Sequence, residues 1–390
     1  MDPVRNPFAP GAGSQPPELA GRDRIVSDAD TALQRILLGR PAQSQMLLGL
    51  RGVGKTVLLN KIEQTAEAHG YLTSFIEAPE DRKLVDLLYP KIHQVLRKLS
   101  LVEAAKATTH KAMRALRSFA SAFRINMGDF EVSVDPEPGT ADSGNLEYDI
   151  TELFLKVGEA AKAASRGWVL LIDEVQYLSA EELGALIVAI HRINQKGLPV
   201  ILFGAGLPAI AALSGDAKSY AERLFTFPEV DALPKDAAAN AIRQPIEEEG
   251  ETIDEALLDQ IVTSTKGYPY FLQEWGYQVW NASQQSPISV GCIEVAEREA
   301  LRRLDEGFFK VRADRLTPKE KEYVIAMARL GTGPYRSADV AEALNEKLTT
   351  LGPRRAQIIA KGMIYSPAHG DIAFTVPMFD EYLKRHWIVD

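Results

Sequence analysis

Eight consecutive residues have the types and the order that bind a phosphate group: Gly49, Leu50, Arg51, Gly52, Val53, Gly54, Lys55 and Thr56. They fit the pattern G-x-x-x-x-G-K-[ST] of a phosphate-binding loop. Apolar residues 46–48 predict a short buried strand before the loop, and residues 57–69 predict a helix after it. Loop N–H groups, with that of Val57, would then surround an anion at a helix N-terminus, where the helix dipole adds partial positive charge.

Within this loop, two side chains have separate expected roles. Lys55 is expected to reach the β- and γ-phosphates of a nucleoside triphosphate, and Thr56 to hold Mg²⁺ through its hydroxyl. A chance match in a glycine-rich turn is the alternative, and a second motif in the chain argues against it.

The second motif is an apolar run, residues 168–172, that ends in Asp173 and Glu174. The run is short and rich in branched residues, which favours a central parallel strand. We expect Asp173 to hold Mg²⁺, directly or through water, and Glu174 to orient and deprotonate the attacking water. Many strands end in acids simply because they meet solvent, but the upstream loop favours the catalytic interpretation.

The nucleotide is expected to be ATP. The chain has one Asn-Lys pair, Asn60-Lys61, and it lacks the Asp of the guanine-reading pattern N-K-x-D. It also lies within the helix that follows the loop. We therefore expect ATP and Mg²⁺ as the cofactors.

Composition and charge limit the possible environments of this 390-residue chain. It is 46% hydrophobic and 25% charged, as soluble proteins are, and its net charge of −9 excludes a general polyanion binder. The single cysteine, Cys292, suits a reducing cytosol, and the longest apolar run, residues 198–213, is interrupted by Pro and Gly. The sequence therefore predicts a soluble cytoplasmic protein without a membrane segment.

The order of the predicted elements indicates several domains. Residues 1–17 are expected to be a disordered lead-in, and residues 18–232 an α/β core with strands at 71–77, 200–203 and 224–227. A helix is expected from Ser27, capped by Ser27 or Asp28. A basic helical insertion is expected at about 82–146, with long helices in 82–123, a strand at 130–134 and a mobile acidic loop at 135–146. Its basic face would be solvated or would bind DNA or an acidic subunit.

The rest of the chain is predicted to form a helical lid, residues 233–308, and a winged helix-turn-helix, residues 309–390. The latter rests on helices at 317–330, 337–344 and 351–361, then two strands around His369-Gly370 and a helix at 378–386. Residues 310–390 carry 13 Lys and Arg against 10 Asp and Glu. Four side chains of the third helix could meet phosphates or base edges of double-stranded DNA: Arg354, Arg355, Gln357 and Lys361.

With these motifs, residues 18–390 resemble the AAA+/STAND class of P-loop ATPases, related to initiator (origin-recognition-like) proteins and archaeal ATPases. The resemblance implies a three-layer parallel sheet, a helical lid and a C-terminal winged helix. Leu19-Ala20-Gly21-Arg22-Asp23 is similar to the Gly-Arg-acid box of the family, which implies that Arg22 lies near adenine. Without the resemblance, this segment is an ordinary turn into a helix.

Two further elements resemble family motifs. Gly267-Tyr268-Pro269 is similar to a G-x-P element, which implies that Gly267 and Pro269 contact the nucleotide from the lid. The alternative is a glycine stop and a proline start between two helices. Arg223 stands where the family has a γ-phosphate-sensing or finger arginine, acting in cis or in trans. The alternative for Arg223 is a surface ion pair.

Two departures from the family pattern favour a slow switch over a motor. The strand that ends at residues 203–206 lacks a polar side chain at its end, and no lid arginine is evident near Gly267.

The function expected first is an ATPase switch that acts on DNA or on a DNA-bound assembly. The alternative is a signalling or assembly switch whose winged helix docks a protein partner. A homo-oligomer is compatible with both. A nucleotide-dependent enzyme with a small-molecule substrate has no second catalytic constellation to support it.

Overall fold

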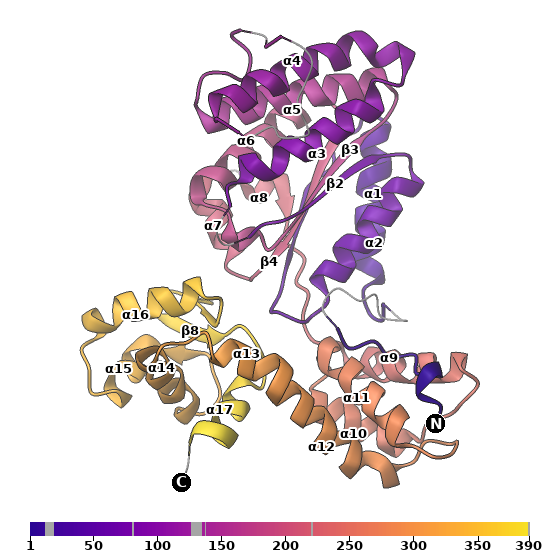
Figure 1. The fold of residues 1–390 in the computed structure, drawn as a ribbon, viewed down its shortest axis with the longest axis vertical. Coiled ribbons are helices and arrows are strands. Elements are labelled where there is room, and N and C mark those ends of the chain that lie inside the picture. Colours follow the sequence, from indigo (N-terminus) through magenta and orange to yellow (C-terminus); the bar gives the residue numbers. More distant parts are fainter. Residues whose placement is uncertain (12–18, 80–81, 126–134, 137, 220, 389–390) are drawn as a thin grey trace. The chain divides into compact units, whose positions relative to one another are not determined.

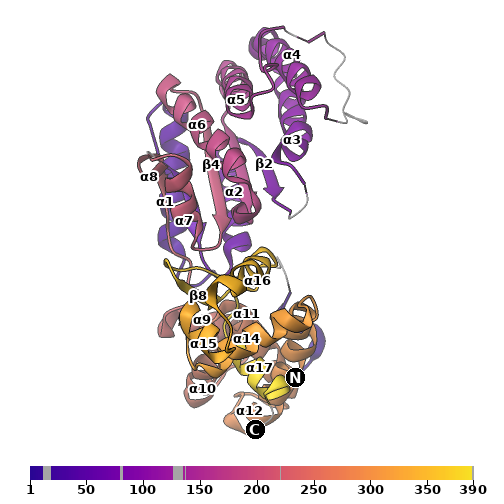
Figure 2. The same ribbon diagram turned by 90° about the vertical axis from the view of Figure 1, so that its left-hand side faces the viewer.

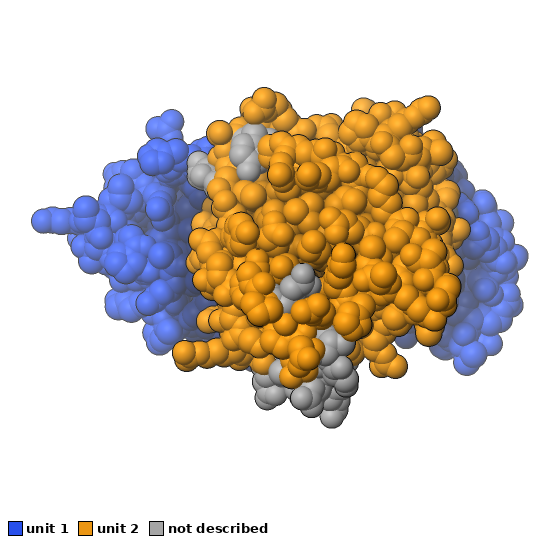
Figure 3. All heavy atoms as spheres, turned by 90° about the horizontal axis from the view of Figure 1, so that it is seen from above, with its two compact units in different colours: residues 1–21, 50–54, 231–390 blue, residues 22–49, 55–230 orange. Residues whose placement is uncertain are grey.

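A computed structural model describes residues 1–11, 19–79, 82–125, 135–136, 138–219 and 221–388. The chain forms two compact units, which Figure 3 colours separately. The first contains residues 1–21, 50–54 and 231–390, and the second contains residues 22–49 and 55–230. The phosphate-binding loop is thus divided, because residues 50–54 group with the C-terminal half of the chain.

A five-stranded sheet forms the centre of the second unit (Figure 1). Its strands are β1 (Ser44–Leu48), β2 (Leu72–Glu77), β3 (Trp168–Asp173), β4 (Val200–Gly206) and β5 (Phe225–Thr226). Their order is β2-β3-β4-β1-β5 and every pairing is parallel. Every residue of β1, β3 and β4 is buried. Burial on both faces explains why β3 and β4 are apolar almost throughout rather than alternating, while β1 begins with two buried polar residues, Ser44 and Gln45.

Helices cover both faces of this sheet: α1 (Asp23–Leu37), α2 (Lys55–Ala68), α3 (Leu84–Leu99), α4 (Lys106–Ala122), α5 (Leu146–Ala163), α6 (Ala180–Lys196), α7 (Ile210–Ala217) and α8 (Ala221–Leu224). One face, which includes Leu170 and Leu202, shares a core with α3 to α6. The residues that alternate with them, such as Val169 and Phe203, are buried on the opposite face. The predicted three-layer parallel α/β fold is confirmed.

The insertion between β2 and β3 follows the prediction in part. Helices α3 and α4 occur within residues 82–123 as expected, and α4 packs against α5 (Figures 1 and 2). The predicted strand at 130–134 lies outside the described residues. The loop expected to be mobile is tied down near its end, because Ser143 and Gly144 donate hydrogen bonds to the fully buried carboxylate of Asp149.

The start of α1 differs from the prediction. The helix begins at Asp23, with Arg22 at the N-cap, so Ser27 and Asp28 lie inside it and do not cap it. Gly21 has φ +67°. A left-handed glycine redirects the chain just before Arg22, so that the helix starts there without a side-chain cap.

In the first unit, the helical region contains α9 (Lys235–Glu248), α10 (Glu255–Thr265), α11 (Pro269–Ala282), α12 (Ile293–Arg303), the π-helical segment η6 (Leu304–Phe309) and α13 (Lys310–Ala313). The last three form one continuous helical stretch, so the expected boundary between residues 308 and 309 falls within it. Aromatic contacts explain this continuity, because Phe309 packs against Phe271 of α11 and also against Phe379 and Tyr382 near the C-terminus.

The C-terminal part has the predicted winged-helix elements: α14 (Pro318–Arg329), β6 (Tyr335–Arg336), α15 (Ser337–Ala343), α16 (Leu348–Ala360), β7 (Ile364–Tyr365), β8 (Asp371–Phe374) and α17 (Phe379–Trp387). A capping box of Thr317 and Glu320 starts α14. The strands form an antiparallel sheet in the order β6-β8-β7. Strand β6, with two residues, was too short to be predicted.

The expectation of a disordered lead-in is wrong for residues 2–9. Residues Pro3–Arg5 form a 3-10 turn, η1, and Phe8 is buried against the helical region. Phe8 supplies apolar surface that a composition rich in Pro, Gly and Ala does not suggest. Residues 12–17 lie outside the described part of the chain.

Candidate active site

The phosphate-binding loop connects β1 to α2 in the way its sequence predicts. Gly52 and Gly54 have φ of +85° and +94°, in the region that favours glycine. Lys55 is the first residue of α2 and is buried, and its Nζ donates a hydrogen bond of 3.0 Å to the carbonyl of Gly49. The ammonium group is therefore held at the start of the loop, next to the N-terminus of α2.

Thr56 and Asp173 meet although 117 residues separate them. The Thr56 hydroxyl donates a hydrogen bond of 2.5 Å to Oδ2 of Asp173, the last residue of β3, while Oδ1 accepts from the N–H of Glu174. Burial raises the pKa of Asp173 from its ordinary value, and Glu174 also raises it; the Thr56 and Glu174 hydrogen bonds and Lys55 oppose this. A hydroxyl beside a carboxylate suits Mg²⁺, which prefers oxygen ligands.

The structure adds Gln176, which the sequence analysis missed. Its Nε2 donates a hydrogen bond to the carboxylate of Glu174, and its Oε1 accepts from the N–H of Leu207 at 3.1 Å. Gln176 thereby links the carboxyl ends of β3 and β4. A Cβ on Gly206 would collide with Oε1 of Gln176, so glycine at 206 leaves room for this side chain.

Gln176 changes the expectation that no polar side chain lies at the end of β4. Strand β4 ends without a polar side chain, as its sequence shows, but Gln176 brings a carboxamide to that place from the neighbouring segment. One signal in the sequence could have identified Gln176. It is a polar residue two positions after Glu174, at the edge of the sheet where the parallel strands β3 and β4 both end.

Residues 50–54 of the loop contact the C-terminal half of the chain within the first unit. The N–H of Tyr270 donates to the carbonyl of Gly52 at 3.2 Å, and the Tyr268 hydroxyl donates to the carbonyl of Arg51. The N–H of Arg51 in turn donates to the carbonyl of Thr375 at 3.2 Å. These three residues hold loop backbone, and the sequence analysis named none of them as a site residue.

Gly267 and Pro269 have structural roles. Gly267 has φ +68°, its carbonyl accepts from Leu233 at 2.8 Å, and a Cβ would collide with the carbonyl of Leu233. Pro269 is the first residue of α11, where its missing N–H costs nothing. Their contact with a nucleotide stays a prediction. It is the residue between them, Tyr268, that reaches the loop.

Two arginines of the second unit are placed differently. Arg22 is buried at the N-cap of α1, and its role near adenine stays a prediction. Arg223 is exposed in α8, immediately before β5. Phe225 pairs with Ser44, the first residue of β1, so Arg223 lies at the amino edge of the parallel sheet. The loop follows the opposite edge, the carboxyl end of β1.

A groove of about 950 Å³ runs beside Arg223. It is lined by residues of α1, of the segment 41–45 and of the segment 223–229. The Arg223 side chain therefore lines a surface groove of the second unit and does not lie at the Lys55 end of β1.

Within the winged helix, three of the four predicted DNA-contacting side chains have partners in the chain. Arg354 pairs with Glu346 at 3.1 Å, Arg355 donates to Ser337 at 2.9 Å, and Lys361 pairs with the buried Glu320 at 2.6 Å. Gln357 is exposed. The cations of α16 are therefore less available for phosphates than the sequence suggested.

A concave site lies between α16 and the wing, the hairpin formed by β7, residues 366–370 and β8. It has a volume of about 700 Å³, and its lining includes Arg336, Arg355, His369 and the acidic Asp371 beside the apolar Leu348 and Leu351. The lining therefore combines two arginines with one acidic residue and apolar side chains.

Comparison with known proteins gives one informative family match. Residues 18–203 match the family described as AAA ATPase domain, and residues 306–383 match a Domain of unknown function (DUF8462). No curated protein matches the sequence.

Among solved structures, the fold is similar to a Walker-type ATPase of Pyrococcus abyssi, with a TM-score of 0.58 at 15% identity over 94% of this chain and 96% of that one. The Aeropyrum pernix Orc1 protein in complex with DNA matches with a TM-score of 0.45 at 14% identity, over 98% and 96%. Cdc6p from Pyrobaculum aerophilum matches at 0.47 and 15%, over 98% and 96%. The last two scores are too low to carry an argument, and the first supports the fold alone.

Among the helices in the described part of the chain, none combines the length and the apolar character that crossing a bilayer requires.

Proposed function

We propose that this chain is a switch that binds Mg-ATP and hydrolyses it slowly, because residues 18–203 match the family described as AAA ATPase domain. The observation that carries this proposal is the 2.5 Å contact between Thr56 and Asp173, beside Lys55 at the N-terminus of α2. It joins the two motifs that the sequence keeps 117 residues apart.

Each group of the site has a chemical task in the proposed reaction. Loop N–H groups and Lys55 would bind the phosphates, and Thr56 and Asp173 would hold Mg²⁺, which would supply positive charge to the phosphate oxygens. Glu174 would accept a proton from the attacking water as its oxygen bonds to the γ-phosphorus, while the bond from that phosphorus to the β–γ bridging oxygen breaks and ADP leaves. Gln176 orients the Glu174 carboxylate through its hydrogen bond. Slow turnover follows from the absence of an evident lid arginine near Gly267.

The proposed chemistry is tested by measuring ATP binding and phosphate release separately. Lys55→Ala should lose detectable ATP binding, because it removes the buried cation. Glu174→Gln should keep ATP affinity but lower hydrolysis by about 100-fold or more, the usual contribution of a general base. Lys98→Ala, on the exposed end of α3, is the control and should match the wild type. Wild-type hydrolysis by Glu174→Gln would remove the proposed base.

For the partner, we propose double-stranded DNA or a DNA-bound assembly, contacted through α16 and the wing. A protein partner is the second candidate. The ion pairs of Arg354 and Lys361 and the net charge of −9 favour this second candidate, because DNA affinity depends on free cations at the phosphates. The single cysteine supports a cytoplasmic location for either.

Anisotropy of labelled duplex DNA, titrated with the chain across a salt series, distinguishes the two partners. The series is run with and without a slowly hydrolysed ATP analogue. Affinity that falls steeply with salt supports DNA binding. Absence of salt-dependent binding in both nucleotide states would remove DNA and leave the protein-docking function.

A further inference from the structure

The N-terminal residues 2–9 lie along helix α11 in the opposite chain direction. The carbonyl of Asp2 accepts from Trp280 Nε1 at 2.8 Å, near the end of α11. Ala9 donates its N–H to Gln273 at 3.3 Å, near the start of the helix. Contacts therefore extend over about two turns of α11.

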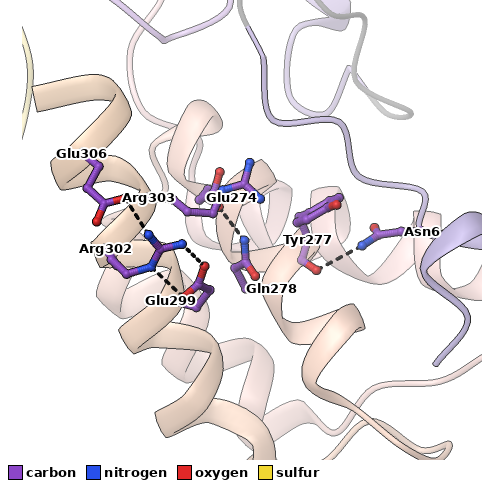
Figure 4. A network of polar contacts seen from close by, with 8 residues as sticks. All are labelled: Asn6, Glu274, Tyr277, Gln278, Glu299, Arg302, Arg303 and Glu306. Atoms are coloured by element: carbon purple, nitrogen blue, oxygen red, sulfur yellow. Dashed lines mark hydrogen bonds and ion pairs between the residues drawn. The ribbon is translucent and has the colours of Figure 1, made fainter. Parts of the chain in front are cut away.

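Asn6 makes the central polar contacts of this segment. Its Nδ2 donates hydrogen bonds of 3.0 Å to the Tyr277 carbonyl and to Oδ1 of Asn281, and Figure 4 shows the first of these. Its own Oδ1 accepts from the N–H of Phe8 at 3.0 Å. One carboxamide thus binds the helix and also sets the backbone that leads to Phe8.

Phe8 is the apolar anchor, and Gly276 makes room for it. The ring is 3% exposed, and a Cβ built on Gly276 would lie 2.6 Å from it. Glycine inside a helix is unfavourable relative to alanine, so its place in α11 requires a reason. Close approach of the Phe8 ring supplies that reason.

The remaining contacts of the segment are polar: the Met1 ammonium donates to the carbonyl of Ser283, and the exposed Arg5 guanidinium donates to the carbonyl of Glu249 at 2.5 Å. Val4 is 92% exposed, and the Arg5–Glu249 ion pair is partly exposed, where such pairs contribute little. Docking must also overcome the entropy of ordering eight residues. The favourable contributions are one buried ring and a few hydrogen bonds, and the entropy cost of ordering the segment opposes them. The docked segment is therefore easy to displace.

We propose that this face of α11 is a peptide-binding site for a segment with Asn and Phe two residues apart. The chain's own residues 2–9 occupy it reversibly, and the same segment of a second copy can replace them. The residues of this site are not those of the proposed nucleotide site, so its test is independent of the proposed ATPase function.

The test uses the full chain with Asn6→Ala and Phe8→Ala, which weakens the internal segment, and a fluorescent peptide of residues 2–10. In anisotropy titrations without nucleotide, the double variant should bind the peptide at least about tenfold more tightly than the wild type, whose own segment competes. A peptide carrying the same two alanines is the control and should not bind. Equal affinity of wild type and double variant, or no binding by either, would overturn the proposal.

A third substitution tests the receptor side. Gly276→Ala in the double variant should abolish peptide binding, while Gly291→Ala, whose Cβ would meet only Ser289 Oγ at 3.8 Å, should leave it intact. Should Gly276→Ala fail to fold, as judged by circular dichroism, Asn281→Ala provides the same comparison and should weaken binding severalfold. Unchanged peptide affinity in either receptor variant would contradict the assigned site.

Discussion

At the residue scale, the site brings a buried cation and a buried carboxylate to adjacent ends of structural elements. Lys55 begins α2 and Asp173 ends β3, and both are almost inaccessible to solvent. Burial disfavours charge on an acid, and the raised pKa of Asp173 reflects this cost. A divalent cation bound between Thr56 and Asp173 would offset this cost of burying the ionised carboxylate. An exposed carboxylate has no such cost to offset, so an exposed pair could not replace this arrangement.

Gln176 provides a prediction about orientation rather than proton transfer. Gln176→Ala frees the Glu174 carboxylate but removes no group that touches the phosphates. ATP affinity should stay within about twofold of the wild-type value. The hydrolysis rate should fall roughly tenfold, which is less than the effect of removing the base itself. Phosphate release and nucleotide titration measure the two quantities. A parallel loss of affinity and rate would instead indicate damage to the whole site.

At the element scale, the parallel strands place different functional groups at the two edges of the sheet. Arg223 precedes β5 at one edge, and the phosphate-binding loop follows β1 at the other. The five residues of β1 span about 16 Å, which exceeds the length of an arginine side chain. This placement argues against contact of Arg223 with the loop of its own copy, and action in trans stays a prediction.

The prediction for Arg223 uses a mixture of two variants. Arg223→Ala and Glu174→Gln should each hydrolyse ATP poorly alone. If Arg223 acts on a neighbouring copy, mixing them forms sites with an intact arginine from one copy and an intact glutamate from the other. Phosphate release by the mixture should then exceed the sum of the separate samples. Strict additivity, together with no increase in molar mass on adding ATP, would argue against action in trans.

The winged helix contains a pH-sensitive contact at Glu320, whose side chain is 2% exposed. Burial alone would raise its pKa, but the Lys361 ion pair and the hydrogen bonds from Thr317 outweigh burial, so the pKa lies below the ordinary 4.5. A lowered folded-state pKa adds stability above the unfolded value, and this contribution disappears as the pH falls through the folded pKa.

Lys361→Met tests that contact. At neutral pH it should lower the free energy of unfolding by about 1–3 kcal/mol, because it leaves a buried carboxylate without its cation. Part of the stability loss below pH 4.5 should also disappear. Lys319→Met breaks an exposed pair with Glu322 and should change stability by about 0.5 kcal/mol or less. Urea unfolding followed by circular dichroism at several pH values compares the two variants, and equal effects would contradict the buried-pair argument.

At the scale of the whole molecule, two compact units predict two unfolding transitions. Trp168 lies in one unit, and Trp275 and Trp280 lie in the other. Mg-ATP at 100 times its dissociation constant should stabilise the folded chain that binds it by about 2.7 kcal/mol. Comparison of wild type with Trp168→Phe assigns the fluorescence transitions. A single transition with both variants would contradict the division into separately cooperative units.

Most of the fold was predictable from local patterns. Apolar runs specified the buried strands, and Thr317-Pro318 marked the start of α14, because these signals depend on neighbours in the sequence. Failures occurred where distant residues decide. Phe8 is ordered because Gly276 lies beneath it, and the helical stretch 293–313 continues because Phe309 joins two parts of one aromatic core.

The phosphate-binding loop and the Asp173-Glu174 pair could be identified from local sequence, because their patterns lie in consecutive residues. Which groups meet across the sheet depends on the three-dimensional fold: Thr56 with Asp173, Gln176 with Glu174, and Arg223 at the far edge. The reason is physical. Strand order and register place side chains that are far apart in the chain, and no local spacing encodes that order.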